Sequence, residues 1–223
     1  MLRATQKLIS QKLISQKFND LEKNKRFGLI IIQHLLEDTE LFLNLLRSAN
    51  FNILQIYGIE YSTKTNILNR IKNNGINVCS PKVSNLKKTL RSYLTKNIEA
   101  FNAQFDGIII HEVGGYFADI LSETKSSISF DNCITGVIEE TKQGLWRYQE
   151  ITSLNYPVVS IADSILKDVE GRYIGQAAAN VVREDLNIMD ISLKTLKVGI
   201  IGYRKCSILI FSIEDLLSFW EKS

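Results

Sequence analysis

Short, fully apolar runs separated by stretches of helical spacing constrain the fold of this chain more than any other feature. The first run, FGLIIIQ at residues 27–33, is typical of a strand that is buried on both faces. Five further runs are NILQIYG (52–58), INVCSP (76–81), GIIIHE (107–112), NCITGVIEE (132–140) and YPVVSIA (156–162). Because helical patterns lie between them, the sequence predicts an α/β fold with a mainly parallel sheet.

The expected helices follow the apolar runs. They cover LLEDTELFLNLLRSA (35–49), TKTNILNRIKNNG (63–75, closed by Gly75), a polar stretch through about residue 104, residues 141–154, and a long helix over 163–190. TLKVGIIGY (195–203) then predicts a new buried strand that ends in glycine, as at the start of a second domain.

The length, apolar runs and cysteine count of the chain exclude several classes of protein. The 223 residues, 45% of them apolar, suffice for one domain and a piece of another. No apolar run approaches the roughly 18 residues of a membrane span. The three scattered cysteines argue against a disulfide framework and for a reducing compartment, and their spacing fits no zinc site. We therefore expect a cytoplasmic protein with no membrane partner and no metal.

The positive charge lies at the N-terminus. Residues 1–26 hold seven Lys and Arg and two acidic residues, so the remaining chain is slightly acidic. Nucleic-acid binding requires a basic face, so we expect no nucleic-acid partner. The leader repeats QKLIS without a stripe of helical period and lacks the features of a secretory signal, which favours a solvated helix or a loose extension.

Polar residues follow four of the apolar runs, where the ligand crevice of an open parallel sheet lies. These residues include both histidines of the chain, His34 and His111, and the adjacent Glu139 and Glu140. Each residue also has a simpler explanation. A polar residue at a strand end can mark where the chain reaches water, His111 can be a core histidine, and the two glutamates can favour the N-terminus of the next helix. Since adjacent residues at a strand end point to opposite sides, we expect only one of the two glutamates to face a ligand.

The segment IIGYRKCS is a poor dinucleotide loop. The G-x-G-x-x-G fingerprint needs three glycines, but its positions here are Gly202, Arg204 and Ser207. An arginine at the second position would place a side chain where the pyrophosphate must lie. We therefore expect this chain alone to bind no NAD.

Several segments together resemble S-adenosylhomocysteine hydrolase (adenosylhomocysteinase). GVIEETKQGLWR resembles the G-x-x-E-E-T-x-x-G stretch of that family, and YPVVSIADSILKDVEGRYIGQ its P-x-x-x-V-N-D-S-x-x-K segment with the hinge helix. HLLEDTELFLNLL, IEYSTKTNILNRIKNNGINV and KVGIIGY resemble its first substrate-binding turn, its second strand–helix unit and the first strand of its NAD domain. The similarity runs in order from about residue 27 to 203.

The resemblance implies a flavodoxin-like or Rossmann-like parallel sheet with helices on both faces. It implies a substrate-type domain over 27–162, a hinge helix over 163–190 and the start of an NAD-binding Rossmann domain over 191–223, after the leader. The family converts S-adenosylhomocysteine and water to adenosine and homocysteine. Bound NAD oxidises the ribose 3′-hydroxyl, and the enzyme is a cytosolic tetramer. The ligand implied for this chain is adenosine-like.

The resemblance also assigns roles to individual positions. By resemblance the catalytic residues are His34 and Lys167, the substrate-binding residues are Asp38, Thr39, Ser62, Thr63, Glu140 and Lys167, and the cofactor-binding residues are Thr141 and Gly202. Asp38 stands where a glutamate is usual, and Glu140 matches the residue that binds the ribose hydroxyls.

Other positions depart from the family. Val113 replaces an acid before the glycine pair and can neither take a proton nor accept a hydrogen bond. Lys142, Gln143, Gly171, Arg172 and Gln176 also differ from the family pattern. The similarity stops at Arg204, for which our hypothesis is a shifted reading frame or a premature stop. We expect a degenerate, truncated relative that is catalytically inactive as this chain.

Two alternatives remain open. In one, the pocket is vestigial and the protein acts in subunit association, as a homo-oligomer or with a full-length relative. In the other, a longer form is an active enzyme for a different nucleoside-like substrate.

Overall fold

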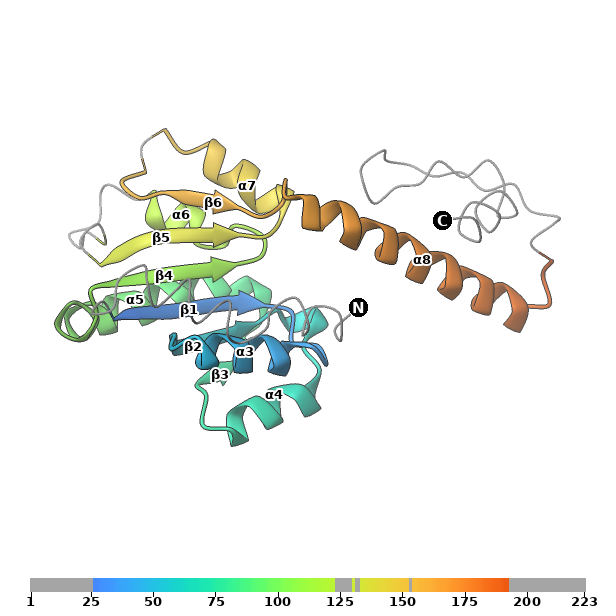
Figure 1. Ribbon diagram of the computed structural model, residues 1–223, viewed down its shortest axis with the longest axis horizontal. Coiled ribbons are helices and arrows are strands. Elements are labelled where there is room, and N and C mark those ends of the chain that lie inside the picture. Colours follow the sequence, from blue (N-terminus) through green and yellow to red (C-terminus); the bar gives the residue numbers. More distant parts are fainter. Residues whose placement is uncertain (1–25, 123–129, 131–132, 153, 193–223) are drawn as a thin grey trace. The chain divides into compact units, whose positions relative to one another are not determined.

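Six parallel strands form one sheet in the computed structural model, which describes residues 26–122, 130, 133–152 and 154–192 (Figure 1). The strand order is β3-β2-β1-β4-β5-β6. The strands are β1 (Phe27–Gln33), β2 (Asn52–Gly58), β3 (Val78–Cys79), β4 (Gly107–Glu112), β5 (Ile134–Glu139) and β6 (Val158–Ser160). The predicted parallel α/β fold is confirmed, and the order is that of a Rossmann-type sheet whose direction of winding reverses between β1 and β4.

Helices connect the strands. They are α3 (Thr39–Ser48), α4 (Thr65–Asn73), α5 (Val83–Gln104), the single turn α6 (Ala118–Leu121), α7 (Lys142–Gln149) and the 3-10 turn η1 (Glu60–Ser62). The chain divides into two units, Met1–Ala162 and Asp163–Ser223, and each is described by itself. In the second unit, α8 (Ile165–Ile188) is one continuous helix of 24 residues.

Both faces of the sheet are covered, as the apolar runs predict. Leu29 and Ile31 of β1 pack in one core with residues of α3 and α4, including Leu43 and Ile67. Ile30 and the other alternate residues of β1 pack in a second core with α5, α6 and α7. Because successive side chains of a strand point to opposite faces, an unbroken apolar run is needed to supply both cores.

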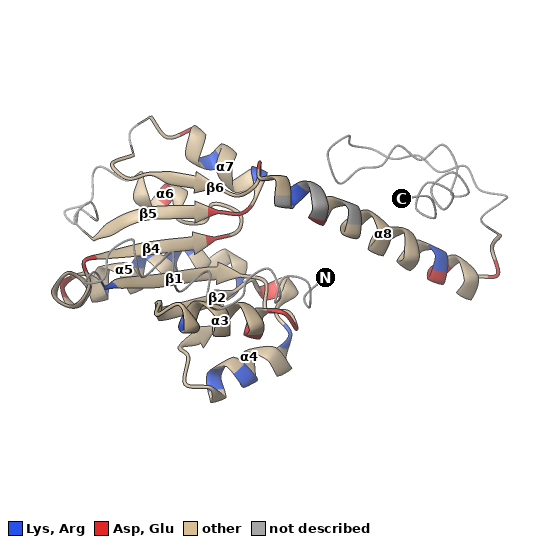
Figure 2. Cartoon of the chain, in the orientation of Figure 1, with Lys and Arg blue, Asp and Glu red and all other residues tan. Residues whose placement is uncertain are grey.

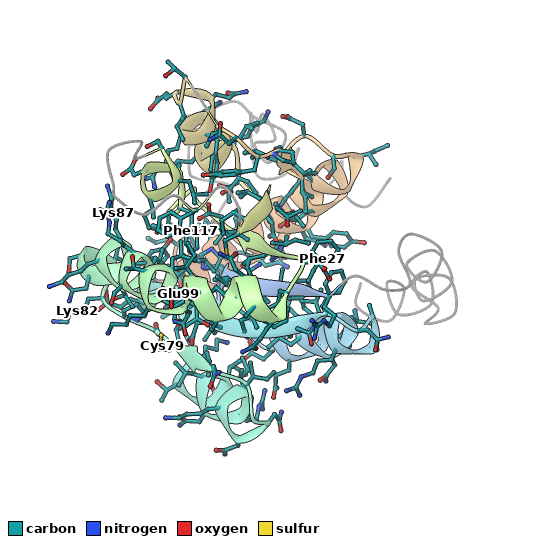
Figure 3. The ribbon with its side chains drawn as sticks, turned by 90° about the vertical axis from the view of Figure 1, so that its left-hand side faces the viewer. Phe27, Cys79, Lys82, Lys87, Glu99 and Phe117 are labelled. Atoms are coloured by element: carbon teal, nitrogen blue, oxygen red, sulfur yellow. The ribbon has the colours of Figure 1, made fainter. Side chains whose placement is uncertain are left out.

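The helix α5 shows how a helix of mixed composition is held on the sheet. Leu86, Leu90 and Leu94 recur every four residues and are buried. Lys87 and Glu99 lie on the exposed side of the same helix (Figure 3). This stripe of leucines, continued by the buried Phe101, thus anchors the 22-residue helix on the sheet.

Several predicted elements are shorter in the structure. The third strand pairs only at Val78 and Cys79, because it is an edge strand with one neighbour. The helix expected over 141–154 ends at Gln149, and the one expected from residue 35 begins at Thr39. The predictions for the leader and for the strand at 195–203 lie outside the described residues.

Candidate functional site

The carboxyl ends of β1, β4 and β5 bring the predicted polar residues together. These strands are neighbours in the sheet, and the switch point between β1 and β4 is where ligands bind in open α/β sheets. Acidic residues mark the ends of β4 and β5 (Figure 2). Gln33 and His34 come from the end of β1, His111 from β4, and Glu140 follows β5.

Glu139 is a structural residue. Its side chain has no exposed surface, and its Oε1 accepts hydrogen bonds from the Gly114 amide (3.0 Å), the Thr141 amide (2.7 Å) and the Thr141 hydroxyl (2.7 Å). Its Oε2 accepts from the Gly115 amide at 2.8 Å. The carboxylate therefore joins the end of β5 to the loop after β4 and is not available to a ligand.

Two glycine features make this arrangement possible. Gly114 and Gly115 adopt φ values of 95° and 67°, which let both amides turn toward Glu139. A Cβ on Gly144 would lie 2.1 Å from the Glu139 carboxyl carbon, so only glycine leaves room for that carboxylate. The spacing of Glu139, Thr141 and Gly144 in the E-E-T-x-x-G stretch thus has a structural reason within this fold.

Thr141 caps α7 and has no hydrogen-bonding capacity left. Its hydroxyl donates to Glu139 and accepts from the amides of Gly144 (3.0 Å) and Gly114 (3.1 Å). A hydroxyl has one proton and two lone pairs, so all are used. The Thr141 hydroxyl is therefore committed to protein partners. The NAD contact that the resemblance implies for Thr141 stays a prediction, and Gly202 lies outside the described residues.

Glu140 points the other way, as expected for the residue next to Glu139. Its side chain is 23% exposed, and its Oε1 lies 2.8 Å from Nε2 of His111. The same oxygen accepts from Nε2 of Gln33 at 3.1 Å. His111 and Gln33, from two different strands, thus contact the same carboxylate oxygen at the switch point.

His34 is joined to the loop after β2. Its Nδ1 is 2.5 Å from the hydroxyl of Ser62, whose oxygen is also 3.2 Å from the Ile59 carbonyl. The ring of Tyr61 lies beside it, with ring centroids 6.0 Å apart. The structure therefore brings the predicted residues His34 and Ser62 into direct contact.

Two further predicted residues hold the backbone of these loops. Thr39 is buried, accepts from the Leu36 amide at 2.9 Å and donates to the His34 carbonyl at 3.0 Å. Thr63 donates to the Ile59 carbonyl at 2.8 Å and contacts the Ser80 hydroxyl at 3.1 Å. Both hydroxyls thus shape the turns that carry His34 and Ser62.

Asp38 and Lys167 are placed differently. Asp38 is exposed at the start of α3, and its side chain makes no capping hydrogen bond. Lys167 belongs to the second unit, in the first turn of α8, where its Nζ lies 2.6 Å from Oε2 of Glu170.

Residue types alone did not reveal the buried acid Glu112. It has no exposed surface, and its carboxyl group accepts hydrogen bonds from the Phe117 amide (3.2 Å) and from the Tyr148 hydroxyl. Burial raises the pKa of Glu112 to about 8, and the nearby Glu139 adds to that rise. Phe117 itself is fully buried among the side chains of the first unit (Figure 3). The next residue, Val113, which replaces the expected acid, is buried in the core.

Two geometric patterns, a metal-ligand cluster and a membrane-spanning helix, are absent from the part of the chain that the structure describes. Within residues 26–122, 130, 133–152 and 154–192, no three His, Cys, Asp or Glu residues are grouped so that they could hold a metal ion. Within the same residues, no helix has both the length and the apolar character needed to cross a bilayer.

No model of a known protein family matches the sequence, and no characterised protein matches it. The resemblance to S-adenosylhomocysteine hydrolase therefore depends on the motifs quoted above.

Proposed function

We propose that this chain binds an adenosine-like nucleoside at the carboxyl ends of β1, β4 and β5. The observation that carries the proposal is the Glu140 carboxylate, partly exposed at the switch point and held there by His111 and Gln33. A fixed carboxylate is a strong acceptor for the two adjacent hydroxyls of a ribose, which a deoxyribose cannot both supply.

The proposed pose uses the residues around Glu140. The ribose hydroxyls would bind Glu140. His34 and Ser62 would lie at the edge of the nucleoside, and the exposed Asp38 would reach its base. In this proposal the chain is a divergent relative of S-adenosylhomocysteine hydrolase.

We propose binding without turnover. Hydride transfer in the family needs NAD, and the described residue assigned to NAD, Thr141, has its hydroxyl committed to protein partners. Val113 cannot serve as the acid that the family places before the glycine pair. A nucleoside-binding role needs neither feature.

Calorimetry tests the proposal. Adenosine and S-adenosylhomocysteine should bind the unmodified chain, and 2′,3′-dideoxyadenosine should bind at least tenfold more weakly because it lacks both hydroxyls. Glu140→Gln should weaken adenosine roughly 10- to 100-fold, the effect of losing a hydrogen bond to a charged group. Lys167→Ala tests the ribose-binding role that the resemblance assigns to Lys167, and it should also weaken adenosine binding.

Glu150→Gln is the matched control, since Glu150 is exposed at the end of α7, and adenosine affinity should be unchanged. Equal affinity for adenosine and its dideoxy analogue, or no heat with either ligand, would refute the proposal. A stable oligomer without ligand binding would instead favour the role in subunit association.

A further inference from the structure

His111 is almost fully buried, yet one of its ring nitrogens makes a polar contact. Its side chain is 7% exposed, and Nε2 lies 2.8 Å from Oε1 of Glu140. The ring packs on Phe42 of α3, with ring centroids 5.3 Å apart. The other nitrogen, Nδ1, is buried and has no hydrogen-bond partner among the described residues.

These contacts favour one tautomer of the ring. A proton on Nδ1 would be a buried donor with no acceptor, which is costly. A bare Nε2 would face a carboxylate oxygen, lone pair to lone pair, at hydrogen-bonding distance. The neutral ring with its proton on Nε2 avoids both, so Nε2–H donates to Glu140.

Gln33 supplies the second donor, and its orientation is fixed. Its side-chain oxygen accepts from the His34 backbone amide at 2.9 Å, which can only donate. The side-chain nitrogen must then face Glu140, where it donates at 3.1 Å. A flip of the Gln33 side-chain amide would break its hydrogen bond with the His34 amide. Gln33 therefore presents a donor, and not an acceptor, to Oε1 of Glu140.

We propose that His111, as the Nε2–H tautomer, is a positioning residue that holds the Glu140 carboxylate in place for the ligand, together with Gln33. The ligand part of this inference rests on the proposed nucleoside-binding function. The hydrogen bond itself does not, and it can be measured without ligand.

Nitrogen-15 NMR of the imidazole rings tests the hydrogen bond in the free protein. The chain has only two histidines, so His111→Gln assigns both ring systems. We expect a bare-nitrogen signal for Nδ1 of His111 and a protonated-nitrogen signal for Nε2. In Glu140→Leu the Nε2 signal should shift, because its acceptor is gone. A proton on Nδ1, or an Nε2 chemical shift that is unchanged in Glu140→Leu, would overturn the inference.

Adenosine binding tests the positioning role. His111→Leu removes the donor and should weaken adenosine about tenfold, whereas His111→Gln places an amide N–H near the position of Nε2 and should stay within threefold of the unmodified chain. Phe42→Leu is the control for packing alone and should also stay within threefold.

Equal weakening by His111→Gln and His111→Leu would show that the ring matters only as a packed side chain, and would overturn the positioning role. If the unmodified chain binds no adenosine, the proposed function fails, while the NMR result still decides whether His111 holds Glu140.

Discussion

Glu112 and Glu139 are register partners on the neighbouring strands β4 and β5, and neither side chain has any exposed surface. Two ionised carboxylates that are buried on neighbouring strands would repel each other. The structure avoids this by treating them differently: Glu139 accepts four hydrogen bonds from loop amides and a hydroxyl, whereas the pKa of Glu112 rises to about 8. At neutral pH Glu112 therefore keeps its proton, which relieves the repulsion.

Stability should fall as the pH rises from about 4.5 to 8. Burial is the largest cause of the raised pKa of Glu112, whose ordinary value is 4.5. Between these values the unfolded chain has lost the proton that the folded chain keeps, so the free energy of unfolding decreases by up to about 1.4 kcal/mol per pH unit. Glu112→Gln should flatten this slope in urea titrations at pH 5, 6 and 7. The same slope in both proteins would contradict the assignment.

The two adjacent glutamates should differ sharply in their contribution to stability. Glu139→Gln places an NH₂ group against donors and should cost about 3 kcal/mol, because buried charged hydrogen bonds are lost. Glu140→Gln keeps an oxygen for Gln33 and His111 and should cost less than about 1 kcal/mol. Urea unfolding of the two variants measures the difference, and similar costs would contradict the division of roles.

Gly144→Ala should destabilise the protein although alanine is the better helix former. The new Cβ would lie 2.1 Å from the Glu139 carboxyl carbon, so the carboxylate must leave its four donors. We expect a loss of at least about 2 kcal/mol, against a gain of about 1 kcal/mol from helix propensity. Gln143→Ala, at the exposed neighbouring position in α7, should change the free energy of unfolding by less than about 0.5 kcal/mol. Thermal unfolding compares the two.

Substitutions at the adjacent residues Asp38 and Thr39 should have different effects, one on ligand binding and the other on stability. Thr39→Val removes the hydroxyl that joins the Leu36 amide to the His34 carbonyl and should cost about 1–2 kcal/mol of stability. Asp38→Ala changes an exposed side chain and should leave stability within about 0.5 kcal/mol. Under the proposed function, Asp38→Ala should nevertheless weaken adenosine in calorimetry. A large stability loss in Asp38→Ala would show that its role is structural.

The central strands could be predicted almost to the residue because burial on both faces leaves an unbroken apolar run. FGLIIIQ, NILQIYG and GIIIHE coincide with β1, β2 and β4. The edge strands are less well predicted: INVCSP pairs at two residues and YPVVSIA at three, since an edge strand has a neighbour on only one side. The turn α6 was missed, because four residues do not establish a helical period.

By itself, the sequence determined that polar and acidic residues follow the strands and that adjacent glutamates must point apart. Only the tertiary structure decided that Glu139 is the buried one and that Gln33, 107 residues earlier, shares an oxygen of Glu140 with His111. Local patterns follow from the period of a strand or helix. Which strands become neighbours depends on packing both faces of the sheet at once, and that is settled by contacts between residues far apart in the chain.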